Sequence, residues 1–140
     1  MTAGPGSTVN GIYQYGEDDS EAQFSDLLNR QSTALQTKFA DSGWINYTAF
    51  TSPWTFYTDG NFSRLAYRKV GNRVFINGGI SNPGAASFAV GTMPVGFRPA
   101  RGMHSVSNTG VAFYVFTTGV IQLSSAVTGS VILNIEYYTD

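Results

Sequence analysis

Hydrophobic and polar residues alternate most regularly in the middle of the chain. Between residues 65 and 80, two runs of β-branched and aromatic residues flank Gly71-Asn72. A glycine at the first central position suits a two-residue hairpin turn. One face of the second run carries Val74, Ile76 and Ile80. This period of two predicts a β-hairpin at the centre of an antiparallel β-domain.

Turn and strand signals surround this hairpin on both sides. Residues 44–47 and 54–57 form short aromatic-rich runs, and Asp59-Gly60 is a tight-turn pair. We therefore expect 54–57 to pair with 62–70. The tetrapeptide 81–84, Ser-Asn-Pro-Gly, predicts another turn.

The remainder of the chain continues the β pattern. Further strands are expected at 87–92, 103–107, 111–116, 120–123 and 130–138. The two prolines and the glycine between Met93 and Arg101 indicate a structured loop. About eight short strands at intervals near ten residues predict an antiparallel β-sandwich or jelly roll over residues 44–140.

The preceding segment, residues 18–43, has a helical pattern. Ser20 and Gln23 form a capping box at its start, and acidic residues gather there, so a helix is expected over 20–39. Four positions follow the 4-3-4 spacing of a coiled coil: Phe24, Leu28, Gln31 and Leu35. So narrow a seam fits either a helix docked on its own domain or a bundle between chains.

Residues 1–17 have no helical period, so we expect them to be extended or flexible. Three large side chains are unusual for a flexible tail: Ile12, Tyr13 and Tyr15. Two interpretations stay open. The segment is either a frayed terminus or an arm that becomes ordered on another subunit or a larger particle.

Charge changes this picture only locally. The net charge is −1, which excludes a globally basic nucleic-acid binder. Residues 1–41 carry a balance of −4, and residues 42–140 carry +3. This difference indicates either two differently solvated surfaces or a β-part that faces an anionic partner, such as a cell-surface polymer. The chain has no cysteine and no apolar run long enough to span a membrane, so we expect a protein folded in a reducing cytoplasm, with no membrane insertion.

Residue types that support catalysis are scarce. His104 is the single histidine and no Gly-x-Ser-x-Gly motif is present, so we expect no enzyme, no catalytic or metal-binding residues and no cofactor. Binding through exposed rings and polar groups is easier to support. The candidates are Trp44, Trp54, Tyr57, Arg98, Arg101 and His104. Structural alternatives stay open: Trp54 can belong to the core, Arg98 and Arg101 can brace the proline loop or a subunit interface, and His104 can be a packed or rim residue.

Three segments resemble small bacteriophage virion proteins of the tail-fibre or receptor-binding type. They are residues 10–29 (NGIYQYGEDD, then FSDLLN), residues 67–74 (YRKVGNRV) and residues 93–99 (MPVGFRP). The last is similar to the family's leucine-proline-x-glycine-tyrosine-arginine-proline turn, with methionine and phenylalanine substituted.

This resemblance implies a homotrimer on the virion surface, made in the host cytoplasm. Residues 1–17 would attach to other virion proteins through Ile12, Tyr13 and Tyr15. Residues 18–43 would form a trimeric helical stalk, and residues 44–140 a head that contacts a host-surface saccharide. Two alternatives remain: a virion decoration or head fibre without a receptor, and a free carbohydrate-binding module. The family implies no shared catalytic residues.

Overall fold

The computed structural model of the chain describes residues 7–9, 12–14 and 21–139. The chain divides into two compact units, residues 1–39 and residues 40–140. The second unit begins four residues before the boundary expected at 44. The reason is a set of backbone hydrogen bonds: Gly71 N–H donates to Ala40 O at 2.8 Å, and Ser42 N–H donates to Lys69 O at 2.9 Å.

The first unit contains a short antiparallel pair, β1 (Ser7–Val9) and β2 (Ile12–Gln14), and the helix α1 (Glu21–Lys38). The helix confirms the element predicted over 20–39. Of the expected attachment residues, Ile12 and Tyr13 lie in β2, whereas Tyr15 lies outside the described residues, as does the capping Ser20.

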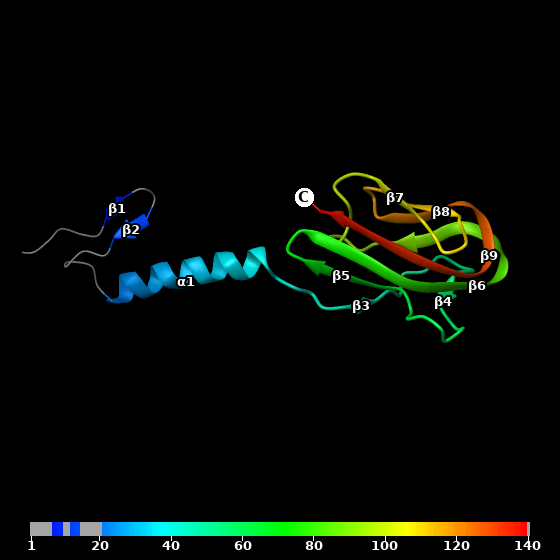
Figure 1. Ribbon diagram of the computed structural model, residues 1–140, viewed down its shortest axis with the longest axis horizontal. Coiled ribbons are helices and arrows are strands. Elements are labelled where there is room, and N and C mark those ends of the chain that lie inside the picture. Colours follow the sequence, from blue (N-terminus) through cyan, green and yellow to red (C-terminus); the bar gives the residue numbers. More distant parts are fainter. Residues whose placement is uncertain (1–6, 10–11, 15–20, 140) are drawn as a thin grey trace, which may run out of the picture. The chain divides into compact units, whose positions relative to one another are not determined.

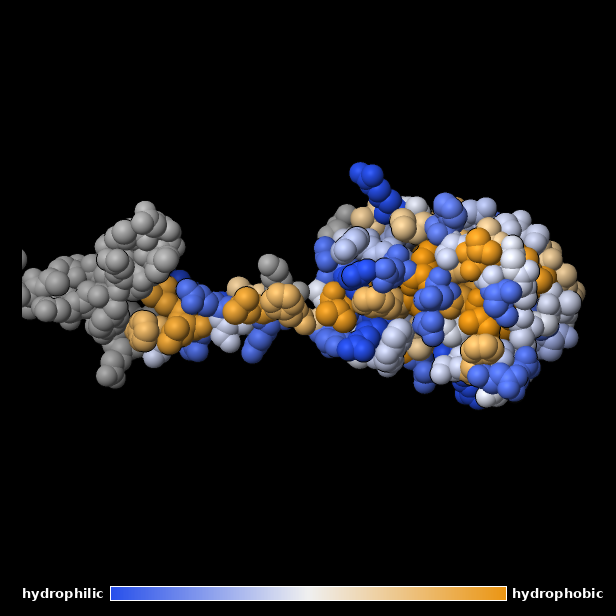
Figure 2. All heavy atoms as spheres, viewed as in Figure 1, coloured by the Kyte–Doolittle hydropathy of each residue, from blue (hydrophilic) through white to orange (hydrophobic). Residues whose placement is uncertain are grey.

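The predicted helical seam is exposed along α1. Leu28 and Leu35 expose 51% and 57% of their surface, and Phe24 and Gln31 are also exposed. Figure 2 shows hydrophobic side chains along the visible face of this helix. An Asp26–Arg30 ion pair of 2.8 Å lies on the same helix, one turn apart. Apolar residues exposed at heptad spacing are typical of helices that associate with other helices.

The second unit, which we call the head, is built on one antiparallel sheet of seven strands in the order β3-β5-β6-β9-β8-β7, with β4 paired to β6. The strands are β3 (Ile45–Asn46), β4 (Thr55–Phe56), β5 (Ala66–Val70), β6 (Arg73–Thr92), β7 (Met103–Val106), β8 (Ala112–Val115) and β9 (Val120–Tyr138). The long strands β6 and β9 pair along most of their length and curve together at one end of the head (Figure 1). Each of these strands therefore contributes one part to each of two packed layers, which fits a β-sandwich.

The central hairpin is confirmed. β5 and β6 pair from Ala66↔Asn77 to Val70↔Arg73 around Gly71-Asn72, and Gly71 has a φ of 61°. The face predicted to be apolar is buried, because Val74 and Ile80 expose none of their surface and Ile76 only 2%.

Two expectations about connections are wrong. Residues 81–84 do not form a separate turn between two strands, since β6 continues through them and shifts its register against β9 between Asn82 and Ser87. The run 54–57 does not pair with 62–70: β4 pairs with β6 at Ile80 and Ser81. The physical reason is that β3 occupies the free edge of β5, whereas β6 beyond β5 still has an open edge opposite β9.

The core lies between the two layers. The face of β9 predicted from period two is buried from Val131 to Tyr137, and it meets Phe113 and Val115 of β8 in one cluster. Large side chains from the first loops, Tyr47 and Trp54, complete that cluster. With the interior filled in this way, side chains available for binding lie on the outer faces and at the edges of the strands.

Candidate functional site

A row of amide side chains crosses the outer face of the layer formed by β3, β5, β6 and β9. Strand pairing places Asn46 opposite Ala66, Ala66 opposite Asn77, and Asn77 opposite Asn134. Paired residues share a face of a sheet. The three asparagines are exposed, whereas the neighbouring Ile76 and Ile135 point inward. Ala66 therefore leaves a low point between two amides.

This low point is part of a hollow of about 410 Å³, which we call the Trp44 hollow. Its lining residues are Trp44, Asn46, Ser63, Arg64, Ala66 and Asn77. Trp44 lies two residues before Asn46 and exposes 54% of its surface. An exposed ring beside amide and hydroxyl groups can stack on an apolar face and hydrogen-bond a polar edge of the same ligand.

Arg64 reaches this hollow because its backbone crosses β6 at two glycines. Leu65 N–H donates to Gly79 O at 2.9 Å, and Gly79 N–H donates to Ser63 O at 2.8 Å. A Cβ on Gly78 would lie 2.4 Å from the backbone oxygen of Arg64, and Gly78 has a φ of 129°. Only glycine permits so close an approach. The Gly78-Gly79 pair thus fixes the position of residues 63–65.

The guanidinium of Arg64 rests on an aromatic ring. Its Cζ lies 5.1 Å from the centre of the Phe56 ring, a cation–π distance. Among the described residues, no carboxylate forms an ion pair with Arg64.

The other two outward-facing arginines of this layer are neutralised. Arg68 forms an ion pair with Asp41, and Arg73 forms one with Glu136 at 2.6 Å. The hydrogen bond from Arg68, together with one from the backbone of Gly43, lowers the pKa of Asp41 to about 2. Asp41 therefore stays ionised at neutral pH and compensates the charge of Arg68.

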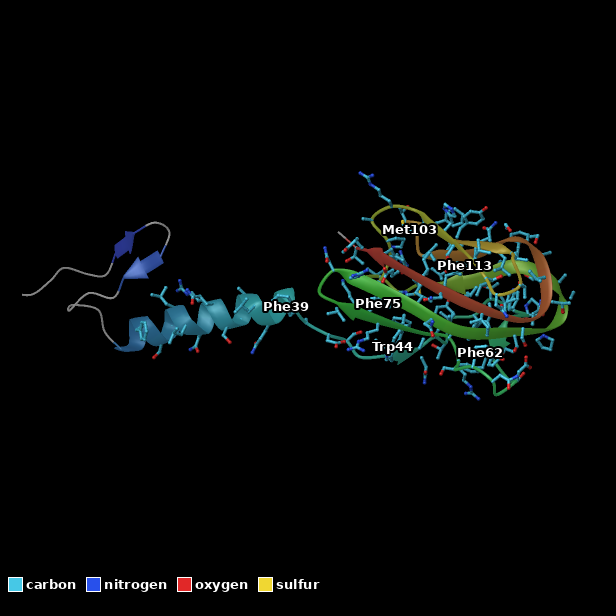
Figure 3. The ribbon with its side chains drawn as sticks, in the orientation of Figure 1. Phe39, Trp44, Phe62, Phe75, Met103 and Phe113 are labelled. Atoms are coloured by element: carbon cyan, nitrogen blue, oxygen red, sulfur yellow. The ribbon has the colours of Figure 1, made fainter. Side chains whose placement is uncertain are left out.

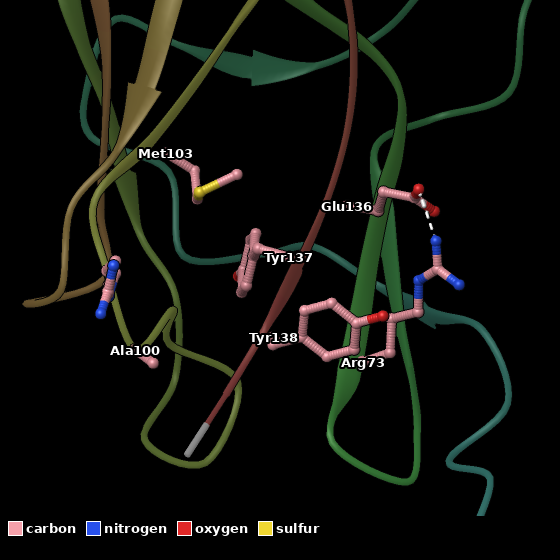
Figure 4. A pocket seen from close by; sticks show the side chains of 7 residues that line it. Arg73, Ala100, Met103, Glu136, Tyr137 and Tyr138 are labelled. Carbon is pink, nitrogen blue, oxygen red and sulfur yellow. Dashed lines mark hydrogen bonds and ion pairs between the residues drawn. The ribbon is translucent and has the colours of Figure 1, made fainter.

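A second hollow, of about 350 Å³, lies where the end of β9 meets the loop before β7; we call it the Met103 hollow. Figure 4 shows Met103, Tyr137 and Tyr138 around it, with the Arg73–Glu136 ion pair at its rim. The Arg73 guanidinium lies 5.7 Å from the Tyr138 ring centre. Arg73 and Glu136 pair with each other, Arg101 is the remaining charged lining residue, and the other walls are largely apolar, so this hollow offers a polar ligand fewer hydrogen-bonding groups than the Trp44 hollow does.

The structure separates the predicted binding residues into different places. Trp44 lines its hollow at the β3 edge, whereas Arg101 lines the Met103 hollow. Figure 3 shows Phe75 of β6 between Trp44 and Met103. His104 is exposed and lines a shallow neighbouring hollow of about 490 Å³, with its ring 6.3 Å from that of Tyr114. It is a rim residue.

Two predicted contact residues are corrected to interior positions. Trp54 exposes 3% of its surface and Tyr57 exposes 5%, so neither can contact a receptor in this fold. The Trp54 indole Nε1 has no hydrogen-bond partner among the described residues. Burial raises the pKa of Tyr57, and the charge of Asp59 adds to that effect. A head of this size fills its interior with large rings, which is why both are buried.

Arg98 has a structural role. Its Nε donates to Met93 O at 3.0 Å, within the proline loop that the sequence predicts over 93–101. This side chain therefore braces the loop, as the alternative interpretation of Arg98 has it.

The sequence interpretation missed Asn46, Ser63, Arg64 and Asn77. One signal was available for Asn77: the two-residue turn at Gly71-Asn72 fixes the hairpin register and puts Asn77 opposite Ala66. The Gly-Gly pair inside a strand also indicated a close backbone approach at that point.

No protein-family model and no curated protein matches the chain. Within residues 7–9, 12–14 and 21–139, no helix is long and apolar enough to cross a membrane. The same residues contain no group of three or more histidine, cysteine or acidic side chains placed to hold a metal ion.

Proposed function

We propose that the chain is a bacteriophage virion protein of the fibre or receptor-binding type, whose head binds a saccharide of the host surface through the Trp44 hollow. It acts as a binding protein without catalysis or cofactor. The observation that carries the saccharide part is the exposed Trp44 ring beside Asn46 and Asn77 in one hollow. Sugar rings present a C–H face to an aromatic ring and hydroxyls to amide groups, so both features serve one ligand.

In this proposal three chains associate through α1. The exposed Leu28 and Leu35 lie seven residues apart, and an inter-chain seam would remove their apolar surface from water. Residues 1–17 attach the trimer to other virion proteins. The virion location and the attachment role rest on the resemblance of residues 10–29, 67–74 and 93–99 to phage fibre proteins.

Binding to cells tests the head. The full-length protein, fluorescently labelled, is titrated against a panel of bacterial cells by flow cytometry. We expect saturable binding to at least one strain, inhibited by polysaccharide extracted from that strain. Trp44→Ala should weaken binding roughly tenfold or more, as truncation of a central aromatic contact does. Phe62→Ala is the matched control, because Phe62 exposes 58% of its surface but does not line the hollow.

Two results would contradict this function. Equal binding by the Trp44→Ala and wild-type proteins would place the receptor contact elsewhere. A protein that labels purified phage particles by immunogold microscopy but binds no cell of the panel would be a structural virion component without a receptor.

A further inference from the structure

We infer that the saccharide bound in the Trp44 hollow is acidic, and that Arg64 binds its negatively charged group. This inference deepens the proposed function and rests on it. It names a ligand class for the hollow: sugars that carry a carboxylate or a phosphate.

The distribution of charge on the head leads to this conclusion. Its described carboxylates are Asp41, Asp59 and Glu136; the first and the last are engaged by Arg68 and Arg73. No ion pair joins Asp59 to Arg64. Among the described residues that line the hollow, none is acidic. The hollow therefore contains one uncompensated positive charge, and a ligand with a negative group supplies the missing partner.

The setting of Arg64 suits that task. A cation–π contact engages the charge of a guanidinium and uses none of its N–H donors, which lie in its plane. With the Phe56 ring 5.1 Å from Cζ, those donors remain for a planar carboxylate or a phosphate, which arginine binds with two parallel hydrogen bonds. The cation–π contact also restricts the side chain before the ligand arrives, which lowers the entropic cost of binding.

Arg64 works together with the other lining groups. Trp44 supplies the stacking surface, and Asn46 and Asn77 supply donors and acceptors for hydroxyls on either side of Ala66. A hollow of about 410 Å³ falls within the range of pockets that hold small ligands, roughly 300–1,000 Å³. One charged sugar residue of a polymer can therefore occupy it while the chain continues across the exposed face.

The test uses the full-length protein and bacterial capsular and lipopolysaccharide preparations, each in three forms: native, carboxyl-reduced, and dephosphorylated with aqueous hydrofluoric acid. Affinity is measured by biolayer interferometry. We expect one native polysaccharide to bind and one of the two treatments to weaken it roughly tenfold or more, the scale of a lost charge-assisted contact. The effective treatment identifies the group as carboxylate or phosphate.

Single substitutions then test whether Arg64 causes the preference for the native polysaccharide. Arg64→Gln should bind the native polymer only as well as wild type binds the treated one, and the treatment should no longer matter. Arg101→Gln, an exposed arginine that lines the Met103 hollow, is the matched control and should retain the full preference. Trp44→Ala should weaken native and treated forms by the same factor.

The outcomes separate this inference from the function on which it rests. If wild type binds the treated polymers as tightly as the native one, the acidic preference is wrong while saccharide binding stands. If poly-L-glutamate competes as well as the polysaccharide, Arg64 attracts charge without recognising a sugar, and the inference fails. If no polysaccharide binds in any form, the proposed function fails as well.

Discussion

The side chain of Asn82 joins the two long strands of the head where their register shifts: its Nδ2 donates to Val127 O on β9 at 2.9 Å. The same nitrogen donates to Ala85 O at 2.9 Å, and Oδ1 accepts from Gly84 N–H at 2.9 Å. Asn82 exposes only 1% of its surface. One buried amide therefore supplies hydrogen bonds where the ladder is interrupted between Asn82 and Ser87.

Replacing this amide should be costly. Asn82→Ala leaves the carbonyls of Ala85 and Val127 without their donor, so we expect it to lower the free energy of unfolding by about 1–3 kcal/mol. Urea denaturation followed by tryptophan fluorescence measures the change. Asn134→Ala, an exposed asparagine on β9, is the control and should stay within about 0.5 kcal/mol of wild type. A cost at Asn82 as small as that of the control would show that the bulge holds without it.

Asn82 also shows why the sequence predicts strands better than connections. The composition of 81–84 is that of a turn, but Asn-Pro-Gly serves a bulge equally well when a buried amide can reach the partner strand. That partner, Val127, is 45 residues away, so no local pattern reveals the pairing. The burial of Val131 to Tyr137, by contrast, follows from period two alone, because alternate residues of a strand point to opposite faces.

The candidate site, like the fold, could be predicted from the sequence only in part. Trp44 could be predicted because an aromatic residue beside polar loops is a typical contact. Asn46 joins the sheet by pairing with Ala66, which is distant in sequence. The sequence therefore could not predict that Asn46 lies near Asn77 in one hollow with Trp44. Trp54 has the same composition signal as Trp44, and only the packing of the core distinguishes the buried ring from the exposed one.

The pair Asp41–Arg68 predicts a dependence of stability on acid. The pKa of Asp41 is about 2 in the folded head and about 3.8 for an ordinary aspartate. A carboxyl group with a lower pKa in the folded state stabilises it above the ordinary value, and that stabilisation is lost as the pH falls through about 4 toward 2. Melting temperatures from pH 6 to pH 2 should therefore decrease less steeply in Asp41→Asn than in wild type.

Arg68→Gln provides the matched test of the same pair. It removes the hydrogen bond that contributes most to the lowered pKa of Asp41, so its melting temperature should also decrease less steeply toward pH 2 than that of wild type. The Gly43 hydrogen bond preserves part of the effect, and the double variant should match Asp41→Asn. Additive effects of the two substitutions would mean that the ion pair does not couple them.

The exposed helical seam predicts a defined oligomer. The chain has a mass of 15.1 kDa, so a trimer should have about three times that mass in sedimentation equilibrium. Leu28→Ser with Leu35→Ser removes two apolar side chains from the seam, so we expect the mass to fall to that of one chain at micromolar concentration.

The control for the seam uses the same replacement one position further along. Asn29→Ser with Gln36→Ser changes two exposed polar residues of α1 at the same spacing and should leave the mass unchanged. Wild-type protein that sediments as single chains at every concentration tested would overturn the trimer.

The crossing of residues 63–65 over Gly78 links the fold to the acidic-sugar binding that we propose. A methyl group at position 78 would lie 2.4 Å from the Arg64 carbonyl oxygen and would occupy a φ of 129°, which side chains rarely adopt. Gly78→Ala should therefore destabilise the head and displace Arg64 from the Trp44 hollow. At a temperature where it is still folded, it should show a weaker preference for native over treated polysaccharide. Gly102→Ala is the control, because its nearest neighbour would be 4.0 Å away. A stable Gly78→Ala protein with full acidic preference would mean that the glycine does not position Arg64.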